Sequence, residues 1–474
     1  MILVGREYEK QVLEDCLSSG RPEFAVLYGR LRVGKTYLIR QFFSERFSFY
    51  ATGLTGTSNR EKLKVFHRQL REQGDENKEA PEDWFEAFSR LKALLCRESV
   101  YREPTSNKKV VFLDELPWMD SGKSDFLPAL DFFWNSWGST QPDILLMVCG
   151  SAASWIISNI LQNTGGLYNR MTRIIHLRPF SLGECEEFMR VNHLEMSRRQ
   201  IIESYMVFGG IPYYLNFLSP RLNLAQNVEE LCMKRTGQLH DEFRILLSSL
   251  FLHHEKHAAV LNALSKSGKG MTRADLEKMK AIGGGAQLTK VLLELEQCDF
   301  IRKYYAYGKK GNGMIYQLVD PFTLFCYQFM NEHPISSWIS YTASPAYNAW
   351  SGFAFEMVCL HHVAQIKDAL GIRGIESQDY SWRSSKQKDG AQIDLLIDRK
   401  DDVINLCEAK FTTEPFEIDL ACERNLIHKR DLFRQETDSP KSLFITLISA
   451  SGLKKNMHSA CVQNTISGDD LFRR

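Results

Sequence analysis

The sequence predicts an α/β fold whose first part is a doubly wound parallel sheet. Short apolar runs of strand length, such as Phe24–Tyr28 and Val110–Leu113, alternate with stretches of helical periodicity over the first 180 residues. Glycine or acidic residues directly follow several of these runs, which is typical of parallel strands that end at one functional edge. At 474 residues, the chain is also long enough for about two to four domains.

Composition indicates a globular protein and excludes several other classes. The net charge is only +1, so contact with nucleic acid would need a local basic patch. The 11 cysteines are scattered without a C-x-x-C pair, which favours reduced core thiols over a disulfide framework or a zinc site. No signal peptide is evident, and no run approaches the roughly 20 apolar residues that span a bilayer. We therefore expect a cytoplasmic protein without membrane association.

Gly29–Thr36 reads GRLRVGKT and matches the full G-x-x-x-x-G-K-[ST] pattern of a phosphate-binding loop. An apolar strand precedes it and a helix-forming stretch follows, as such a loop requires, whereas a chance Gly-rich turn would lack this context. Lys35 is expected to reach the β- and γ-phosphates of ATP, and the Thr36 hydroxyl to ligate Mg²⁺. The residues expected to contact the nucleotide are Gly29, Arg30, Arg32, Val33, Gly34, Lys35, Thr36 and Tyr37.

Two carboxylates, Asp114 and Glu115, end the apolar run Val110–Leu113. Their place after a phosphate-binding loop gives both a chemical use. We expect Asp114 to hold Mg²⁺ directly or through water, and Glu115 to orient and deprotonate the attacking water. An apolar strand that ends in two acids by chance is the alternative.

Two further positions are candidates for contact with the γ-phosphate. Ser151 stands at the tip of the predicted strand Asp143–Cys149, with Ser154 as the second candidate. Ser151 also suits the N-cap of the following helix, and the two roles are compatible. Arg170 precedes the last predicted strand of the sheet and could act on the γ-phosphate in cis or across a subunit interface, with Arg173 as the second candidate. A solvated arginine explains these positions as well.

Two more segments are candidates for closing over the nucleotide. Gly5 and Arg6 form a turn before the first helix, where they either contact the base or only start that helix. From Ser181 to about residue 238 the pattern is helical only, apart from a Gly-Gly-x-Pro break that ends at Pro212. The break resembles the turn of a helical lid over a nucleotide, although a sharp change of direction alone would also explain it.

The middle of the chain predicts a winged helix-turn-helix. Three short helices and a two-stranded hairpin are expected at residues 257–265, 272–280, 287–297, 299–305 and 314–319. The third helix and the wing normally meet DNA, so Lys290, Lys309 and Lys310 could contact phosphates. Glu294 and Glu296 on the third helix oppose this, and a spacer or protein-contact module is the alternative.

The C-terminal part carries a candidate metal and catalytic site. Asp394 lies in one apolar strand, and Glu408 and Lys410 share a face of the next. The two carboxylates could hold one or two Mg²⁺ ions that activate water, while Lys410 positions or deprotonates that water. An ordinary solvated hairpin is the alternative, but unpaired carboxylates inside apolar strands are costly.

A basic surface for nucleic acid is less evident in this C-terminal part. The nearest basic cluster consists of Arg424, His428, Lys429 and Arg430. A solvated helix face explains these four residues equally well.

Six elements of the first 220 residues or so resemble, in order and spacing, archaeal-type AAA+/STAND ATPases. They are the GRE stretch at Gly5 and the segments GRLRVGKT, FLDELPWMD, CGSAAS, LYNRMT and GGIPYYL. The resemblance implies nucleotide and Mg²⁺ roles for Gly29, Gly34, Lys35, Thr36, Asp114 and Glu115. Asn169 departs from the glycine expected before Arg170.

A second resemblance concerns the C-terminal part. Asp394, Glu408 and Lys410 resemble the D…E-x-K constellation of restriction-endonuclease-like folds, in which archaeal-type ATPases frequently end. Glu356 matches the additional acid that such sites often carry on a helix.

These observations predict four domains and a linker at residues 333–344. The domains are a P-loop ATPase core at 1–180, a helical lid at 181–240, a winged helix at 241–332 and a nuclease-like domain at 345–474. The expected function is Mg²⁺-dependent ATP hydrolysis, with the nucleotide state regulating a nuclease-like domain that acts on nucleic acid. The alternatives are a STAND-type switch that binds a protein partner through an inactive C-terminal domain, and an ATP-dependent DNA-binding regulator. The oligomeric state stays open.

Overall fold

The computed structural model describes residues 3–151, 153–161, 166–167, 169–251, 253–308, 314–331, 335, 337–384 and 390–473. The chain divides into two compact units, Met1–Arg178 and Pro179–Arg474. The unit boundary lies close to the predicted end of the ATPase core. The segments predicted as lid, winged helix and nuclease-like domain all lie in the second unit.

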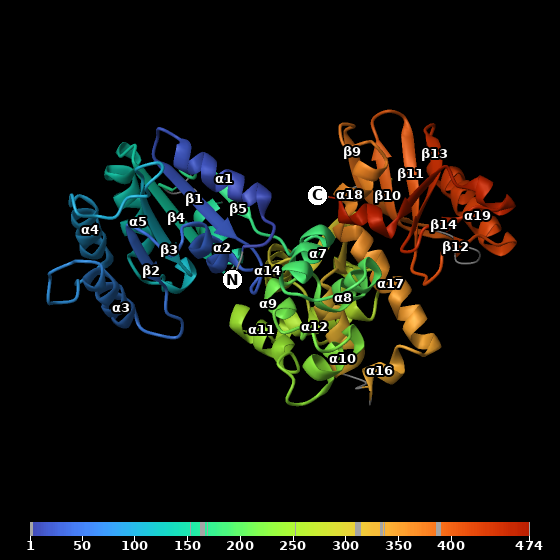
Figure 1. Cartoon of the computed structure of the whole chain (residues 1–474), viewed down its shortest axis with the longest axis horizontal. Coiled ribbons are helices and arrows are strands. Elements are labelled where there is room, and N and C mark those ends of the chain that lie inside the picture. The colour runs from blue at the N-terminus through green and yellow to red at the C-terminus, as the bar shows by residue number, and fades with distance from the viewer. Residues whose placement is uncertain are drawn as a thin grey trace. The chain divides into compact units, whose positions relative to one another are not determined.

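A five-stranded parallel sheet forms the centre of the first unit (Figure 1). Its strands, in spatial order, are β2 (Phe49–Thr52), β3 (Lys109–Asp114), β4 (Ile144–Gly150), β1 (Glu23–Tyr28) and β5 (Arg173–His176). This confirms the predicted α/β class. Because all the strands are parallel, their carboxyl ends share one edge of the sheet. The strand β4 lies between β1 and β3, although it follows β3 in the sequence.

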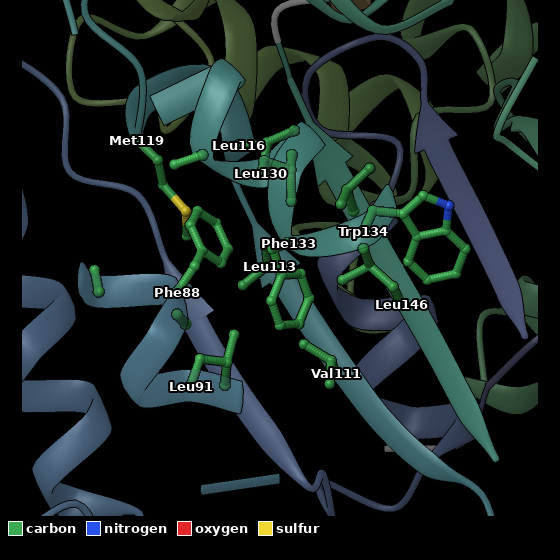
Figure 2. Packing of buried hydrophobic residues seen from close by; sticks show 14 of the residues in the cluster. Phe88, Leu91, Val111, Leu113, Leu116, Met119, Leu130, Phe133, Trp134 and Leu146 are labelled. Carbon is green, nitrogen blue, oxygen red and sulfur yellow. The ribbon is translucent and has the colours of Figure 1, made fainter. Parts of the chain in front are cut away.

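Helices and short helical turns precede or connect these strands. They are α1 (Glu7–Ser18), α2 (Lys35–Phe42), α3 (Asn59–Glu72), α4 (Trp84–Leu95), η1 (Leu116–Trp118), α5 (Phe126–Ser136), η2 (Gly138–Thr140), α6 (Ala153–Ile156) and η3 (Ile157–Leu161). Figure 2 shows Val111 and Leu113 of β3 packed with Phe88 of α4 and Phe133 of α5. Full burial of such a side chain contributes about 1.5–3 kcal/mol to the free energy of unfolding. This packing holds the carboxyl end of β3, where Asp114 lies, in a fixed position.

The second unit begins with helices. They are α7 (Leu182–Val191), α8 (Arg198–Phe208), α9 (Pro212–Leu215), α10 (Leu224–Val228), η4 (Glu229–Met233) and α11 (Glu242–Leu250). Gly209 ends α8 and Gly210 follows it, with φ of 65° and 66°. A Cβ on Gly210 would lie 2.3 Å from the Phe180 carbonyl oxygen, so only glycine fits there. Pro212 then starts α9, which confirms the predicted sharp break.

Three helices and a small antiparallel sheet follow. They are α12 (Glu255–Ser265), β6 (Met271–Thr272), α13 (Arg273–Glu277), α14 (Ala286–Gln297), β7 (Ile301–Tyr305) and β8 (Met314–Leu318), with the strand order β6-β8-β7. Beyond β7, the Tyr307 N–H donates to the Ser381 carbonyl at 2.9 Å, and the Tyr307 ring packs against Tyr380 and Phe433. The end of β7 that leads into the hairpin turn therefore packs against the C-terminal sheet.

The next helices include part of the expected linker. They are α15 (Pro321–Cys326), η5 (Tyr327–Asn331), α16 (Trp338–Tyr341), α17 (Pro345–His361) and α18 (Val363–Ala369). The Trp338 ring is buried against the rings of Phe325, Phe329 and Trp350, and the backbone N–H of Trp338 donates to the Glu229 carboxylate at 2.5 Å. The second half of the expected linker is thus packed structure, because its aromatic residues supply a core.

A mixed five-stranded sheet ends the chain. The elements of this part are β9 (Ser377–Arg383), β10 (Gln392–Arg399), β11 (Val403–Lys410), β12 (Phe416–Glu417), α19 (Leu420–Thr437), β13 (Ser442–Ser449), β14 (Leu453–Lys454), η6 (Met457–Cys461), β15 (Asn464–Ser467) and η7 (Gly468–Phe472). The short strands β12 and β14 pair with each other in a separate two-stranded sheet. The strand order is β15-β13-β11-β10-β9, with β10 antiparallel to both neighbours and β11, β13 and β15 parallel. None of the helices in the described residues is long and apolar enough to cross a membrane.

Candidate functional site

The loop after β1 curls around the ammonium group of Lys35. This group donates to the carbonyl oxygens of Gly29 at 2.8 Å and Arg30 at 2.9 Å, and the side chain is buried. Gly34 has a φ of 90°, and a Cβ on Gly29 would lie 2.3 Å from the Leu177 carbonyl oxygen, so both positions require glycine. The two glycines of the motif are therefore explained by backbone geometry.

Asp114 lies at the end of β3, close to the start of α2. Its Oδ1 atom accepts hydrogen bonds from the Thr36 hydroxyl at 3.0 Å and the Cys149 thiol at 2.6 Å. The Tyr50 hydroxyl lies 3.4 Å from Oδ2. Burial and the charge of Asp114 raise the pKa of the Cys149 thiol well above its usual value and that of Tyr50 to about 12. Both groups therefore stay protonated and act as donors. Thr36 and Asp114 provide the hard oxygen ligands that Mg²⁺ prefers.

Glu115 has a contact that the sequence did not predict. Its Oε2 atom accepts two hydrogen bonds from Ser151, one from the hydroxyl at 2.7 Å and one from the backbone N–H at 3.1 Å. Glu115 has left-handed backbone angles (φ 49°, ψ 47°), and Ser151 follows β4, which adjoins β3. The insertion of β4 beside β3 is what brings the two residues together. The contact of Ser151 with the γ-phosphate stays a prediction, and Ser154 lies half-buried on α6.

The Arg6 side chain contacts the phosphate-binding loop. Its guanidinium donates to the Val33 carbonyl at 3.1 Å and to the Arg178 carbonyl at 2.7 Å, and the side chain is buried. Gly5 and Arg6 both have positive φ, 62° and 63°, so the turn before α1 is tight. Arg6 thus helps to hold the loop in place, and the contact of Gly5 and Arg6 with the base stays a prediction.

The remaining loop positions predicted to contact the nucleotide lie at different depths. Arg30 is buried, Arg32 has a φ of 76°, and Tyr37 on α2 is half-buried, with its pKa raised by burial. Their contacts with a nucleotide stay predictions. The same holds for Pro212, which lies at the first position of α9 in the second unit.

Arg170 and Arg173 lie near the amino-terminal edge of the sheet. In the parallel register, Arg173 of β5 lies opposite Ala25 of β1, whereas the phosphate-binding loop begins after Tyr28. Three residues of strand correspond to about 10 Å, and the Arg173 guanidinium approaches Glu23, still further from the loop, at 4.0 Å. This register places Arg173 away from the loop, and the action of either arginine on the γ-phosphate in cis stays a prediction. Action across a subunit interface stays a prediction, and Arg170 is exposed.

The acids predicted to oppose DNA contact on the third helix of the middle segment are engaged within the unit. Glu294 lies 2.9 Å from the His257 ring nitrogen, and Glu296 lies 2.9 Å from the Lys303 ammonium. Lys290 is exposed and lies 3.8 Å from Glu294. The predicted phosphate contacts Lys309 and Lys310 lie outside the described residues.

The C-terminal acids gather between α17 and the sheet. Glu356, Asp394 and Glu408 line a pocket with room for about one water-sized group. The other lining residues are Cys359, Leu360, Leu395, Cys407, Ala409 and Ile448. Lys410 donates to Glu408 Oε1 at 2.9 Å, which confirms that the two residues share a face of β11. The Gln392 amide donates to Asp394.

A second lysine reaches this cluster. Lys429 of α19 donates to Glu408 Oε2 at 2.7 Å, so each oxygen of Glu408 has its own ammonium partner. Burial opposes the ionisation of Glu408, but the two lysines hold its pKa below the usual value. Burial, followed by the charges of Asp394 and Glu408, raises the pKa of Glu356 to about 8. The solvated-face interpretation of Lys429 is therefore wrong, because its neighbour on the sheet is a carboxylate.

The three acids have the donor chemistry that Mg²⁺ requires. Within the described ranges, however, no group of three or more His, Cys, Asp or Glu side chains is placed to hold a metal ion. As arranged here, Glu408 is occupied by two ammonium groups instead. Its oxygens would have to change partner before binding a metal.

Comparison with known proteins bears on the first part of the chain. Residues 3–218 match the family model of an ATPase domain that occurs predominantly in Archaea. The match reaches past the first unit and through α9 of the second. An uncharacterized protein of Methanocaldococcus jannaschii is 24% identical over 374 residues, which cover 77% of this chain and 78% of that protein.

Two solved structures are similar to parts of the chain. The Walker-type ATPase of Pyrococcus abyssi has a TM-score of 0.47 and 18% identity, and the similarity covers 69% of this chain and 96% of that one. The ORC2 protein of Aeropyrum pernix has a TM-score of 0.42 and 16% identity, with coverage of 69% and 93%. Both TM-scores are below 0.5, so neither similarity carries an argument about this chain. Residues 3–218, somewhat less than half of the chain, are thus similar to ATPase domains of the archaeal type.

Proposed function

We propose that the first unit binds ATP with Mg²⁺ and hydrolyses it. The observation that carries this proposal is the convergence of the phosphate-binding loop with the two acids that end β3. The Thr36 hydroxyl and Asp114 Oδ1 lie 3.0 Å apart. The buried Lys35 ammonium rests on loop carbonyls that a nucleotide phosphate could replace as its partners.

The residues divide the work of hydrolysis. Lys35 stabilises the negative charge on the β- and γ-phosphates. Glu115 orients a water molecule and accepts its proton as the oxygen attacks the γ-phosphorus in line, and the bond to the ADP oxygen breaks. Thr36 and Asp114 would hold Mg²⁺, which supplies further charge neutralisation when bound. Ser151 holds the Glu115 carboxylate in place.

The test is phosphate release from ATP by the intact chain and three variants. Lys35→Ala should abolish turnover, and Glu115→Gln should abolish turnover while retaining ATP binding. Lys62→Ala is the matched control, because Lys62 is also buried with its ammonium on a backbone carbonyl, that of Asp120, away from the loop. Equal turnover by Lys35→Ala and the intact chain would overturn the proposal.

A second candidate function, cleavage of nucleic acid, is favoured by the C-terminal acid cluster. Three acids line one pocket, and Lys410 pairs with one of them, Glu408. The run of elements from α17 through β9, β10 and β11 to α19 and β13 supports the proposed nuclease-like fold. The test is Mg²⁺- or Mn²⁺-dependent cleavage of single- and double-stranded DNA and RNA, with and without ATP. Asp394→Ala should abolish it. Asp398→Ala, on the same strand but paired with Lys441, should not.

The other segments receive supporting roles. We propose that residues 181–240 act as the lid and that the segment from α12 to β8 is a winged helix, whose order of three helices and three strands supports this. Its packing against the C-terminal sheet through Tyr307 favours a protein-contact role over DNA binding. The nucleotide state would then act on the C-terminal domain. Limited proteolysis with an identical pattern in the presence and absence of ATP would contradict this regulation.

Two alternative functions have distinct consequences. A STAND-type switch predicts slow turnover, tight nucleotide retention, a protein partner and no cleavage. A DNA-binding regulator predicts an affinity that falls steeply with salt and that is lost when Lys309 and Lys310 are changed. Arg170 would act on the γ-phosphate in cis or across a subunit interface, and the second case requires an oligomer. A cytoplasmic location stays a prediction.

A further inference from the structure

Lys429 has no role in the functions described so far. It lies on α19, where Arg424 and His428 are exposed, but its own side chain is only 19% exposed. Its ammonium lies 2.7 Å from Glu408 Oε2. A lysine that turns inward from a charged helix loses side-chain entropy and hydration, so its position requires a specific electrostatic partner.

Glu408 alone does not explain the need for two lysines. Lys410, two residues away on the same strand, already pairs with Glu408 at 2.9 Å. Lys429 brings a second positive charge from α19 to the acid cluster, where it also acts electrostatically on Glu356. Positive charge beside a carboxylate cluster offsets the repulsion between the carboxylates and an anionic ligand.

We propose that Lys429 binds a non-bridging oxygen of a phosphodiester group at the C-terminal site, and that Glu408 is its resting partner. This inference rests on the proposed nuclease-like role of the cluster. The long, flexible lysine stem lets the ammonium move from the carboxylate to a phosphate oxygen nearby, and phosphate is a common lysine ligand in proteins. Lys429 makes and breaks only hydrogen bonds, and the ligand class is the phosphodiester backbone of nucleic acid.

The test measures binding and cleavage separately on the full chain. Binding is followed by fluorescence anisotropy of labelled single- and double-stranded oligonucleotides, with Ca²⁺ in place of Mg²⁺, and cleavage is followed with Mg²⁺ or Mn²⁺. Lys429→Met should weaken binding or slow cleavage by about 10- to 100-fold, the usual effect of losing a hydrogen bond to a charged group. Lys429→Arg, which keeps the charge, should retain most of the function.

Lys441→Met is the matched control. The Lys441 ammonium lies 2.7 Å from Asp398, and the side chain is 22% exposed. Lys441→Met therefore loses an ion pair like that of Lys429 in the same domain, but outside the acid pocket. Lys410 still pairs with Glu408 in Lys429→Met, and thermal unfolding of both methionine variants checks their stability. Lys429→Gln repeats the test if Lys429→Met does not fold.

The outcomes separate this inference from the nuclease-like proposal. If the intact chain cleaves and the neutral Lys429 variants cleave and bind like the Lys441 control, this inference is overturned and the nuclease stands. If nothing is cleaved but binding in Ca²⁺ depends on Lys429, the nuclease fails and the phosphate site stands. Absence of any nucleic-acid binding by the intact chain overturns both.

Discussion

Replacing Ser151 by alanine should slow ATP hydrolysis while ATP still binds, because Ser151 contacts the proposed general base, Glu115. The substitution removes the hydroxyl that donates to Glu115 Oε2 at 2.7 Å, but the backbone N–H at 3.1 Å remains. A hydrogen bond to a charged group contributes about 1.5–3 kcal/mol, and the remaining donor should keep the loss near the lower end of this range. We expect a fall in kcat of about tenfold, with a smaller effect in Ser151→Thr.

A double-mutant cycle tests the reasoning. Steady-state phosphate release gives kcat and KM for Ser151→Ala, Glu115→Ala and the double variant, with single-turnover measurements where rates are low. If Ser151 acts through the Glu115 carboxylate, its substitution should have little further effect once that carboxylate is gone. Full additivity of the two losses would refute the argument. The hydroxyl would then act elsewhere, for example on the γ-phosphate as the sequence predicts.

Three further predictions concern stability. His362 is buried, its pKa is lowered to about 4, mainly by burial, and its Nε2 accepts a hydrogen bond from the Leu182 N–H. Unfolding returns the pKa to its ordinary value of 6.5, so about 3 kcal/mol of stability that is present above pH 6.5 should be lost as the pH falls toward 4. Urea unfolding of His362→Gln should therefore show a shallower pH dependence. Gly210→Ala should destabilise the second unit by about 2–5 kcal/mol, through positive φ and the clash with the Phe180 carbonyl, measured as a lower unfolding midpoint. Tyr307→Ala should cost about 2 kcal/mol and speed amide exchange along β9, whereas unchanged exchange there would contradict the packing of Tyr307, next to the hairpin turn, on that strand.

Local signals in the sequence were sufficient for the phosphate-binding loop. Its eight residues are contiguous. The two glycines are required by the local backbone geometry, and Lys35 and Thr36 are required at fixed positions next to the second glycine. The carboxylates of β3 were predictable for the same reason, because a buried apolar run followed by acids marks the functional end of a parallel strand. In the C-terminal part, the two-residue period of a strand was enough to place Glu408 and Lys410 on one face.

Long-range arrangement was not predictable from these signals. Nothing in the order of the strands along the chain states that β4 lies between β1 and β3, so the contacts of Ser151 with Glu115 and of Cys149 with Asp114 were not foreseen. The helix α5 was also missed, because FLPALDFFW is apolar at nearly every position and shows little periodicity. Among the charges of α19, no local pattern distinguishes Lys429, whose direction is set by Glu408 on another element.

The helix α17 joins two segments that the sequence analysis treated as separate domains. It packs against α8 of the predicted lid and against β11 of the C-terminal sheet, and it carries Glu356 into the acid pocket. The Phe355 ring lies 5.5 Å from the Phe411 ring, and the Arg199 guanidinium of α8 lies 5.4 Å from the same ring. Because packed side chains of this kind resist independent displacement, a shift of α8 would be transmitted to the residues beside Lys410. If ATP moves the lid, the acid cluster is therefore the part of the second unit that should respond.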